Sequence, residues 1–127
     1  MSKRSSFPVT VSVLQYLNFI RNKRQEYFIC LSLDSGGQVI KRRTVTIGLL
    51  DMALAHPREV FAGPLKDRAA SVILAHNHPS GSTEPSKQDI KTAQQLVAAG
   101  ILLGIPVGDH IIVAGQEHYS FRRAGLL

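Results

Sequence analysis

The hydrophobic and polar positions near the start of the chain predict one helix followed by a hairpin of two strands. The helix is indicated by apolar residues at helical spacing: Val11, Leu14, Leu17 and Phe19-Ile20. Thr10 is placed to cap this helix at its N-terminus. Two apolar runs follow, Tyr27 to Leu33 and Gln38 to Ile47, and the turn residues Asp34-Ser35-Gly36-Gly37 separate them. These runs therefore predict an antiparallel pair of strands.

A second helix and a buried strand are predicted in the middle of the chain. Pro57 suits the first turn of a helix, and Val60 and Phe61 would then face inward. We expect Gly63-Pro64 to interrupt that helix, because proline lacks an amide proton and clashes with the preceding turn. The run Ala70 to Ala75 has the length and the branched side chains of a buried strand.

The last third of the chain predicts a long helix and a second hairpin. Lys87 to Leu103 keeps a roughly helical apolar period, and Gly104 suits the C-cap. Two short strands, at 110–114 and 118–121, would pair across residues 115–117. Helices and strands that alternate in this way predict an α/β domain with a mixed sheet between helices.

The residues that carry chemistry gather at the end of the central predicted strand. His76 and His78 follow Ala75, and both imidazoles leave the strand on the same side because side chains alternate. Asp89 comes next, beyond a loop rich in turn residues. Two neutral imidazoles and one carboxylate suit a divalent ion such as zinc. Three protein ligands leave a fourth position for water, which is typical of a catalytic rather than a closed structural site.

This constellation resembles the JAMM motif of the JAB/MPN metalloprotease superfamily. The spacing His-x-His, seven residues, Ser, two residues, Asp is met by His76, His78, Ser86 and Asp89. Three longer strings are similar to the RadC branch of that superfamily: HNHPSG at 76–81, HPREVF at 56–61 and DHIIV at 109–113.

The resemblance implies both a fold and a function. The fold would be α/β, a JAB/MPN-like (cytidine-deaminase-like) mixed β-sheet flanked by α-helices, in one domain at 10–127 after a flexible N-terminal arm at 1–9. The implied function is a metallohydrolase, an (iso)peptidase that holds one zinc ion (Zn2+) per chain and acts on a peptide or protein substrate. Two alternatives stay open, a DNA-associated accessory protein of the RadC type and an inactive scaffold.

The resemblance also implies roles for individual residues. Ser86 would support the oxyanion of a tetrahedral intermediate, and an upstream glutamate would be the general base. We prefer Glu26, which begins a strand after the first helix, and keep Glu59 as the alternative. Asp109 could orient a metal-bound imidazole or serve as a further alternative base, although it also suits a turn before a strand. Ser86 and Asp89 equally fit the N-cap and third residue of a helix, a reading compatible with metal binding.

Composition narrows the partners and the compartment. The formal net charge of +6, from 15 basic and 9 acidic residues, allows weak association with DNA through a basic surface, but the basic residues are scattered. The single cysteine, Cys30, lies in an apolar strand, which predicts a buried thiol and fits a reducing cytoplasm. No apolar run approaches the roughly 20 residues that span a bilayer, so we expect a cytoplasmic protein without a membrane partner.

Overall fold

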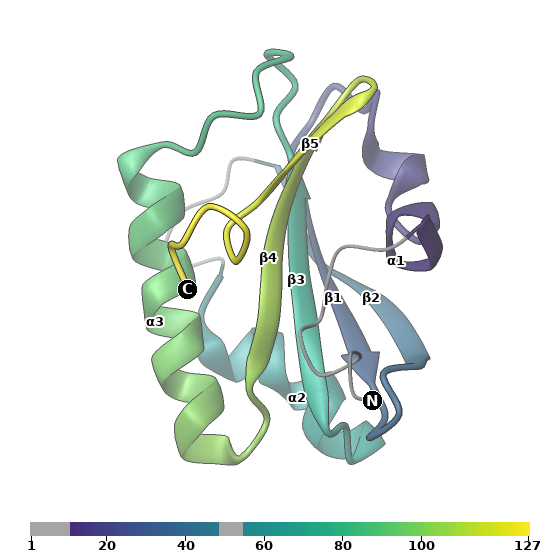
Figure 1. The fold of residues 1–127 in the computed structure, drawn as a ribbon, viewed down its shortest axis with the longest axis vertical. Helices are drawn as coiled ribbons and strands as arrows, with labels where there is room; N and C mark the ends of the chain where they lie inside the picture. The colour runs from purple at the N-terminus through teal and green to yellow at the C-terminus, as the bar shows by residue number, and fades with distance from the viewer. Residues whose placement is uncertain (1–10, 49–54) are drawn as a thin grey trace.

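A mixed sheet of five strands forms the centre of the molecule (Figure 1). The computed structural model describes residues 11–48 and 55–127. The strands are β1 (Tyr27–Leu33), β2 (Val39–Ile47), β3 (Ser71–Asn77), β4 (Val107–Ala114) and β5 (Glu117–Ser120). Their order across the sheet is β2-β1-β3-β4-β5. Only β3 and β4 run parallel among these neighbours, and α3 connects them as such a crossover requires.

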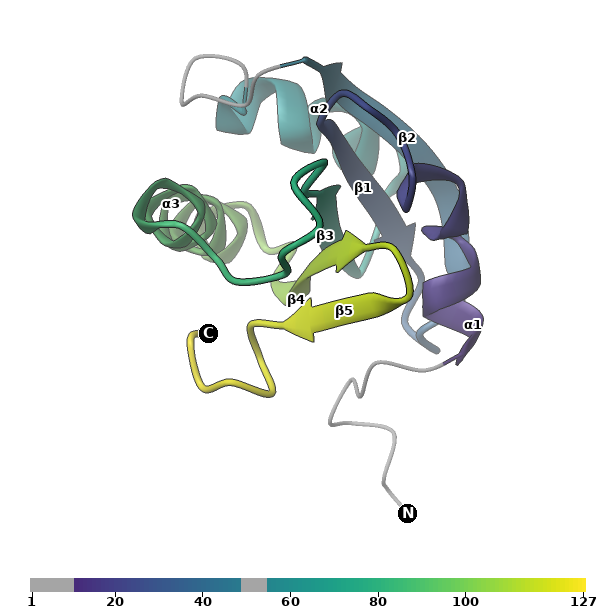
Figure 2. The same ribbon diagram turned by 90° about the horizontal axis from the view of Figure 1, so that it is seen from above.

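Helices cover both faces of the sheet, which confirms the α/β class expected from the sequence. Viewed from above, α1 lies on one side, and α2 and α3 lie on the other (Figure 2). The helical segments are α1 (Val11–Gln15), the 3-10 turn η2 (Asn18–Ile20), α2 (Pro57–Asp67) and α3 (Lys87–Leu103).

The alternation of side chains along the central strands places hydrophobic clusters on both faces of the sheet. Odd-numbered positions of β1, β3 and β4, such as Ile29, Ile73 and Ile111, pack with Leu17 and Ile20. Even-numbered positions of β1 and β3, such as Phe28, Cys30 and Leu74, pack against Phe61 of α2 and Leu96 of α3. Burial raises the pKa of the Cys30 thiol to about 12, so Cys30 belongs to the core as expected.

Most predicted elements are confirmed with shifted ends. The strand at 27–33 and the helix at 87–103 have the predicted bounds, and Gly104 ends the helix with a left-handed backbone (φ 75°). The first helix stops at Gln15 and continues only as a 3-10 turn. The predicted cap Thr10 and the predicted arm at 1–9 lie outside the described residues.

The predicted break at Gly63-Pro64 is wrong, since α2 runs without interruption from Pro57 to Asp67. His56 caps the helix by accepting a hydrogen bond from the Arg58 amide, and Pro64 is buried together with Val60 and Phe61. Packing of this face therefore offsets the hydrogen bond that proline cannot make.

The fourth strand begins earlier than the sequence indicates. Val107 pairs with Val72, and Asp109 pairs with Ile73, across a register shift next to β3. The Gly108-Asp109 pair, which reads as a turn, is therefore part of a buried strand. Pairing with a central strand outweighs the low strand propensity of these two residues.

Gly63 allows a close contact that ties α2 to the edge strand β2. The Arg43 guanidinium makes two hydrogen bonds to the Asp67 carboxylate, of which Nη2 to Oδ1 measures 2.8 Å. A Cβ atom at Gly63 would lie 2.5 Å from Arg43 Nη1, so a side chain there would displace the guanidinium. Gly63 thus serves packing and does not break the helix.

The Arg43–Asp67 pair predicts how stability depends on pH. The hydrogen bond from Arg43 lowers the pKa of Asp67 from 3.8 to about 2. The unfolded state then binds the proton more readily, so the stabilisation is complete above about pH 4 and disappears as the pH falls toward 2. Asp67→Asn should cost about 1 kcal/mol at pH 7, a value reduced for solvent screening, and nearly nothing at pH 2. Denaturant unfolding of both proteins at the two pH values measures this, and an equal cost at both would contradict it.

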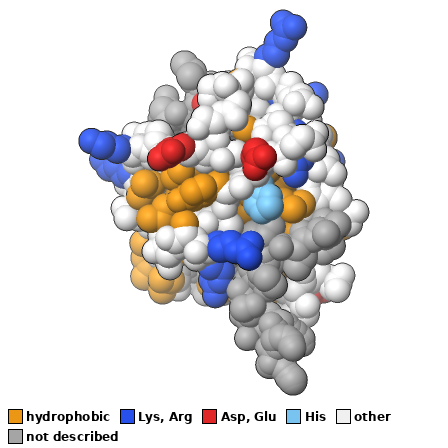
Figure 3. Space-filling view, turned by 45° about the horizontal axis from the view of Figure 1, so that its top comes forward, with side chains coloured by type: hydrophobic (Ala, Val, Ile, Leu, Met, Phe, Trp, Pro, Cys, Tyr) orange, Lys and Arg blue, Asp and Glu red, His pale blue; other side chains and the backbone are white. Residues whose placement is uncertain are grey.

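The basic residues form no continuous surface on the face shown in Figure 3, where blue side chains appear at several places with hydrophobic and uncharged side chains between most of them. Several are held by contacts within the chain. Arg42 lies 4.3 Å from the centre of the Phe19 ring and donates to the Tyr16 carbonyl. Arg21 donates to the carbonyl oxygens of Gly115 and Glu117, which ties the η2 end to the β4–β5 hairpin.

Candidate metal centre

Two histidines and one aspartate converge where β3 ends and α3 begins. His76 belongs to β3 and is completely buried, whereas His78 follows the strand and is partly exposed. Asp89 lies in the first turn of α3 and is 6% exposed. The loop at 79–85 joins the two elements at one end of the sheet (Figure 1). The strand and the helix N-terminus thus bring together the three residues that the spacing predicts.

The three side chains have the separation that a tetrahedral metal site requires. His76 Nε2 lies 3.2 Å from His78 Nε2 and 3.2 Å from Asp89 Oδ1, and His78 Nε2 lies 3.0 Å from Asp89 Oδ2. Ligands about 2.1 Å from a tetrahedral ion stand about 3.4 Å apart, so little movement is needed to surround one. Among the described residues, His76, His78 and Asp89 are therefore a group that could hold a metal ion.

A backbone contact fixes which nitrogen of His78 faces this group. His78 Nδ1 lies 2.8 Å from the carbonyl oxygen of Ser82, and a carbonyl can only accept, so Nδ1 carries the proton. In the neutral ring Nε2 then points its lone pair at the Asp89 carboxylate. Two acceptors at this distance repel one another unless a proton or a cation lies between them. The arrangement accordingly selects for a bound cation, or for a protonated His78 in its place.

Asp89 is both a candidate ligand and part of a helix cap. Its Oδ2 atom accepts from the Ser86 amide at 2.8 Å, and the Ser86 hydroxyl accepts from the Asp89 amide at 3.0 Å. Burial alone raises the pKa of Asp89, but hydrogen bonds with His76 and His78 outweigh it and hold the pKa well below the usual range. The carboxylate is therefore ionised and its direction is fixed by the reciprocal cap.

Comparison with known proteins identifies the family of this chain. The family profile described as RadC-like JAB domain matches residues 9–126. The chain belongs to the RadC-like JAB domain family. It is 50% identical over 103 residues to a UPF0758 protein of Bacillus licheniformis, covering 81% of this chain and 46% of that protein. A UPF0758 protein of Methanosarcina mazei is 42% identical over 125 residues, covering 98% of this chain and 54% of that protein.

The RadC-like family membership accounts for the fold and limits what can be transferred. The mixed five-stranded sheet with its helices is consistent with a JAB/MPN-like fold. The chain spans about half the length of the curated relatives it matches. Within the described residues, no helix has both the length and the apolar character needed to span a bilayer.

A third histidine of the RadC-like domain, His110, contacts the ring nitrogen of His76 that faces away from His78 and Asp89. His110 lies on β4 beside the histidine strand, and its Nε2 atom is 2.9 Å from His76 Nδ1. His110 has no role predictable from the sequence, because it is 34 positions from His76 along the chain and only the parallel pairing of β3 and β4 brings the two rings together. Its place in the DHIIV string next to Asp109 was the available signal.

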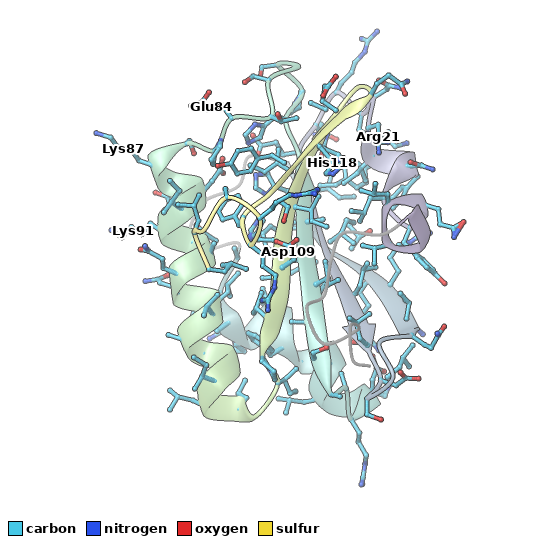
Figure 4. All side chains as sticks on the ribbon, viewed as in Figure 1. Arg21, Glu84, Lys87, Lys91, Asp109 and His118 are labelled. Carbon is cyan, nitrogen blue, oxygen red and sulfur yellow. The ribbon has the colours of Figure 1, made fainter. Side chains whose placement is uncertain are left out.

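Asp109 does not have the geometry expected of a residue that orients an imidazole. Its Oδ2 atom accepts from the Ser120 hydroxyl, and its Oδ1 atom accepts from the amides of His110 and Arg122 at 2.7 and 3.0 Å. Figure 4 shows Asp109 on β4 beside the C-terminal turn. The carboxylate thus holds β5 and the turn after it against β4. Because side chains at adjacent strand positions face opposite sides, Asp109 points away from the side of the sheet that the His110 ring occupies.

Asn77, between the two histidines, faces the other side of β3 and holds the segment that carries Glu26. Its Oδ1 atom accepts from the Tyr27 amide at 2.7 Å, and its Nδ2 atom donates to the Gln25 carbonyl at 3.0 Å. The side chain is completely buried. The Asn77 side-chain amide thus hydrogen-bonds to the backbone on both sides of Glu26. The Gly48 amide also donates to the Glu26 carbonyl.

The structure separates the glutamates that the sequence left as candidates. Glu26 lines a cleft of about 250 Å³ together with Pro79, which directly follows His78. The pKa of His78 is raised mainly by its hydrogen bond with Asp89, and the charge of Glu26 makes a smaller contribution than the contacts with Asp89 and Ser82. Glu59 is exposed on α2 and pairs with Arg58, its Oε2 atom 3.3 Å from Nε. Glu84 is exposed, and Figure 4 shows it at the outer side of the loop near Lys87.

Proposed function

We propose that this domain is a zinc-dependent hydrolase that cleaves peptide or isopeptide bonds. The observation that carries the proposal is the convergence of two imidazole nitrogens and one ionised carboxylate at 3.0–3.2 Å, with the His78 lone pair aimed at Asp89 by the Ser82 carbonyl. Membership of the RadC-like JAB domain family supports the same reading.

Zinc is the metal we propose, because two histidines and one carboxylate with room for a further ligand form a catalytic zinc set. His76, His78 and Asp89 would hold it. Bound there, the ion would act as a Lewis acid and lower the pKa of a coordinated water toward about 7.

The remaining chemistry falls to two side chains at the edges of the site. Glu26, in the cleft beside Pro79, accepts the proton of the attacking water and passes it to the leaving amine. The Ser86 hydroxyl accepts from the Asp89 amide, so its own proton remains available to an oxyanion. Glu59 and Asp109 are the weaker alternatives for the base, since each already binds groups elsewhere in the fold.

The alternatives of the sequence analysis receive less support. Arg21, Arg42 and Arg43 make contacts within the chain, which leaves them less available for a DNA backbone. An inactive scaffold has no need of three converging ligands. We also propose a cytoplasmic location, in keeping with a single buried cysteine.

Removal and return of the metal test the proposed function. Protein purified without chelators should contain about one zinc per chain and cleave members of a peptide library, as followed by mass spectrometry. Dialysis against a chelator should abolish cleavage, and zinc should restore it. His118→Ala, which changes a histidine outside the converging group, is the matched control and should behave as wild type. Equal cleavage by metal-free protein, or no zinc bound after resupply, would refute the proposal.

A further inference from the structure

His110 is a buried histidine whose ring makes one polar contact within the described part of the chain, and that contact is with the proposed ligand His76. It is completely buried, with its ring stacked on Phe121 at 4.7 Å and edge-on to Phe28 at 5.7 Å between centroids. Burial, and next the nearby His76, lower the pKa of His110 well below its ordinary value. Its Nδ1 atom has no hydrogen-bond partner among the described residues.

The hydrogen bond of 2.9 Å between His76 Nδ1 and His110 Nε2 can run in either of two directions. One of the two nitrogens donates and the other accepts. If His76 gives its Nε2 lone pair to a metal, its proton is on Nδ1, and Nδ1 donates to His110 Nε2. The proton of His110 is then on Nδ1, the atom without a partner.

The opposite direction suits the protein without metal. Asp89 Oδ1 lies 3.2 Å from His76 Nε2 and, as an ionised carboxylate, can only accept. His76 then carries its proton on Nε2, and its Nδ1 atom accepts from His110 Nε2. Both arrangements hold the same number of protons on the two rings, so exchange between them is a shift of tautomer and involves no gain or loss of charge.

We propose that His110 is a positioning residue for the metal ligand His76, and that metal binding reverses the hydrogen bond between them. The inference rests on the proposed metal site. Whichever way this hydrogen bond runs, His110 holds the His76 ring through its Nδ1 atom. Phe28 stacks on the same ring at 6.2 Å between centroids. Loading the site leaves one donor, His110 Nδ1–H, buried among aromatic rings.

Metal affinity tests the positioning role without any assay of activity. Zinc affinity is measured by competition with a chromophoric chelator for the wild type, His110→Leu and His110→Gln. Leucine fills the space without an acceptor, so affinity should fall about 10–100-fold. The glutamine amide oxygen can occupy the place of Nε2 and accept from His76, so affinity should stay within a few fold of wild type. His118→Gln is the control for loss of a histidine elsewhere.

Imidazole nitrogen-15 spectra of the wild type test the reversal directly and need no variant to fold. In zinc-loaded protein His110 should be protonated at Nδ1, and in metal-free protein at Nε2. A His110→Leu protein with wild-type affinity, or the same His110 tautomer in both states, would overturn this inference alone. A wild-type protein that binds no zinc would overturn the proposed metal site, and this inference with it.

Discussion

A Glu26→Gln protein is expected to keep its zinc and to cleave peptides about 10²–10⁴-fold more slowly than the wild type, mainly in kcat. Glutamine has nearly the shape of glutamate but cannot accept a proton from water. Glu26 is held through its backbone by Asn77 and Gly48, so the substitution should leave the segment in place. The metal ligands are on other elements and are not changed.

Glu59→Gln is the matched control for this experiment. Glu59 is an exposed glutamate on α2 paired with Arg58, so its variant should keep both zinc content and rate. Rates are measured on the peptide identified in the chelator experiment, at saturating substrate, with zinc quantified in the same samples. Wild-type kcat in Glu26→Gln would exclude Glu26 as the base, and a loss confined to Glu59→Gln would transfer that role to α2.

Asp89→Asn should lower zinc affinity by more than about a hundredfold while leaving the helix cap nearly intact. The loss should exceed the roughly 10–100-fold loss typical of residues that hydrogen-bond to metal ligands, because here a neutral amide replaces the only anionic group among the three proposed ligands. Asparagine can still accept from the Ser86 amide through its Oδ1 atom, as the Asp89 carboxylate does at 2.8 Å. The substitution therefore separates metal binding from capping, two roles that the sequence assigns to the same residue.

Ser86→Ala provides the reciprocal control. It removes the hydroxyl that accepts from the Asp89 amide and should cost about 1 kcal/mol of stability, with zinc still bound. Zinc affinity by chelator competition and unfolding of the metal-free proteins in denaturant measure the two effects. If Asp89→Asn retained wild-type zinc affinity, capping alone would account for Asp89.

The convergence of His76, His78 and Asp89 could be predicted because its geometry is local to two elements. Alternation along a strand places His76 and His78 together, and the capping pattern at Ser86 fixes Asp89 at a helix start. The bounds of β1 and α3 follow from similarly local patterns. Such features depend on residues within a few positions of one another.

The supporting residues could not be predicted, because their partners are distant in sequence. His110 meets His76 across 34 positions, and Asn77 reaches Tyr27 across 50. Both contacts depend on the order β1-β3-β4 in the sheet, which hydrophobic periodicity does not determine. The errors at Pro64 and Asp109 have a related origin, since burial against the rest of the fold outweighed a local propensity in each case.

The alternation of His76, Asn77 and His78 at the end of β3 restricts where insertions and deletions can occur in related sequences. A shift of one position in β3 would turn both imidazoles toward the α1 side and the amide toward the metal group, so ligands and glutamate support would be lost together. The loop has a narrower constraint, because the Ser82 carbonyl must still reach His78. Insertions and deletions should therefore be tolerated mainly in the short stretch between Ser82 and Ser86.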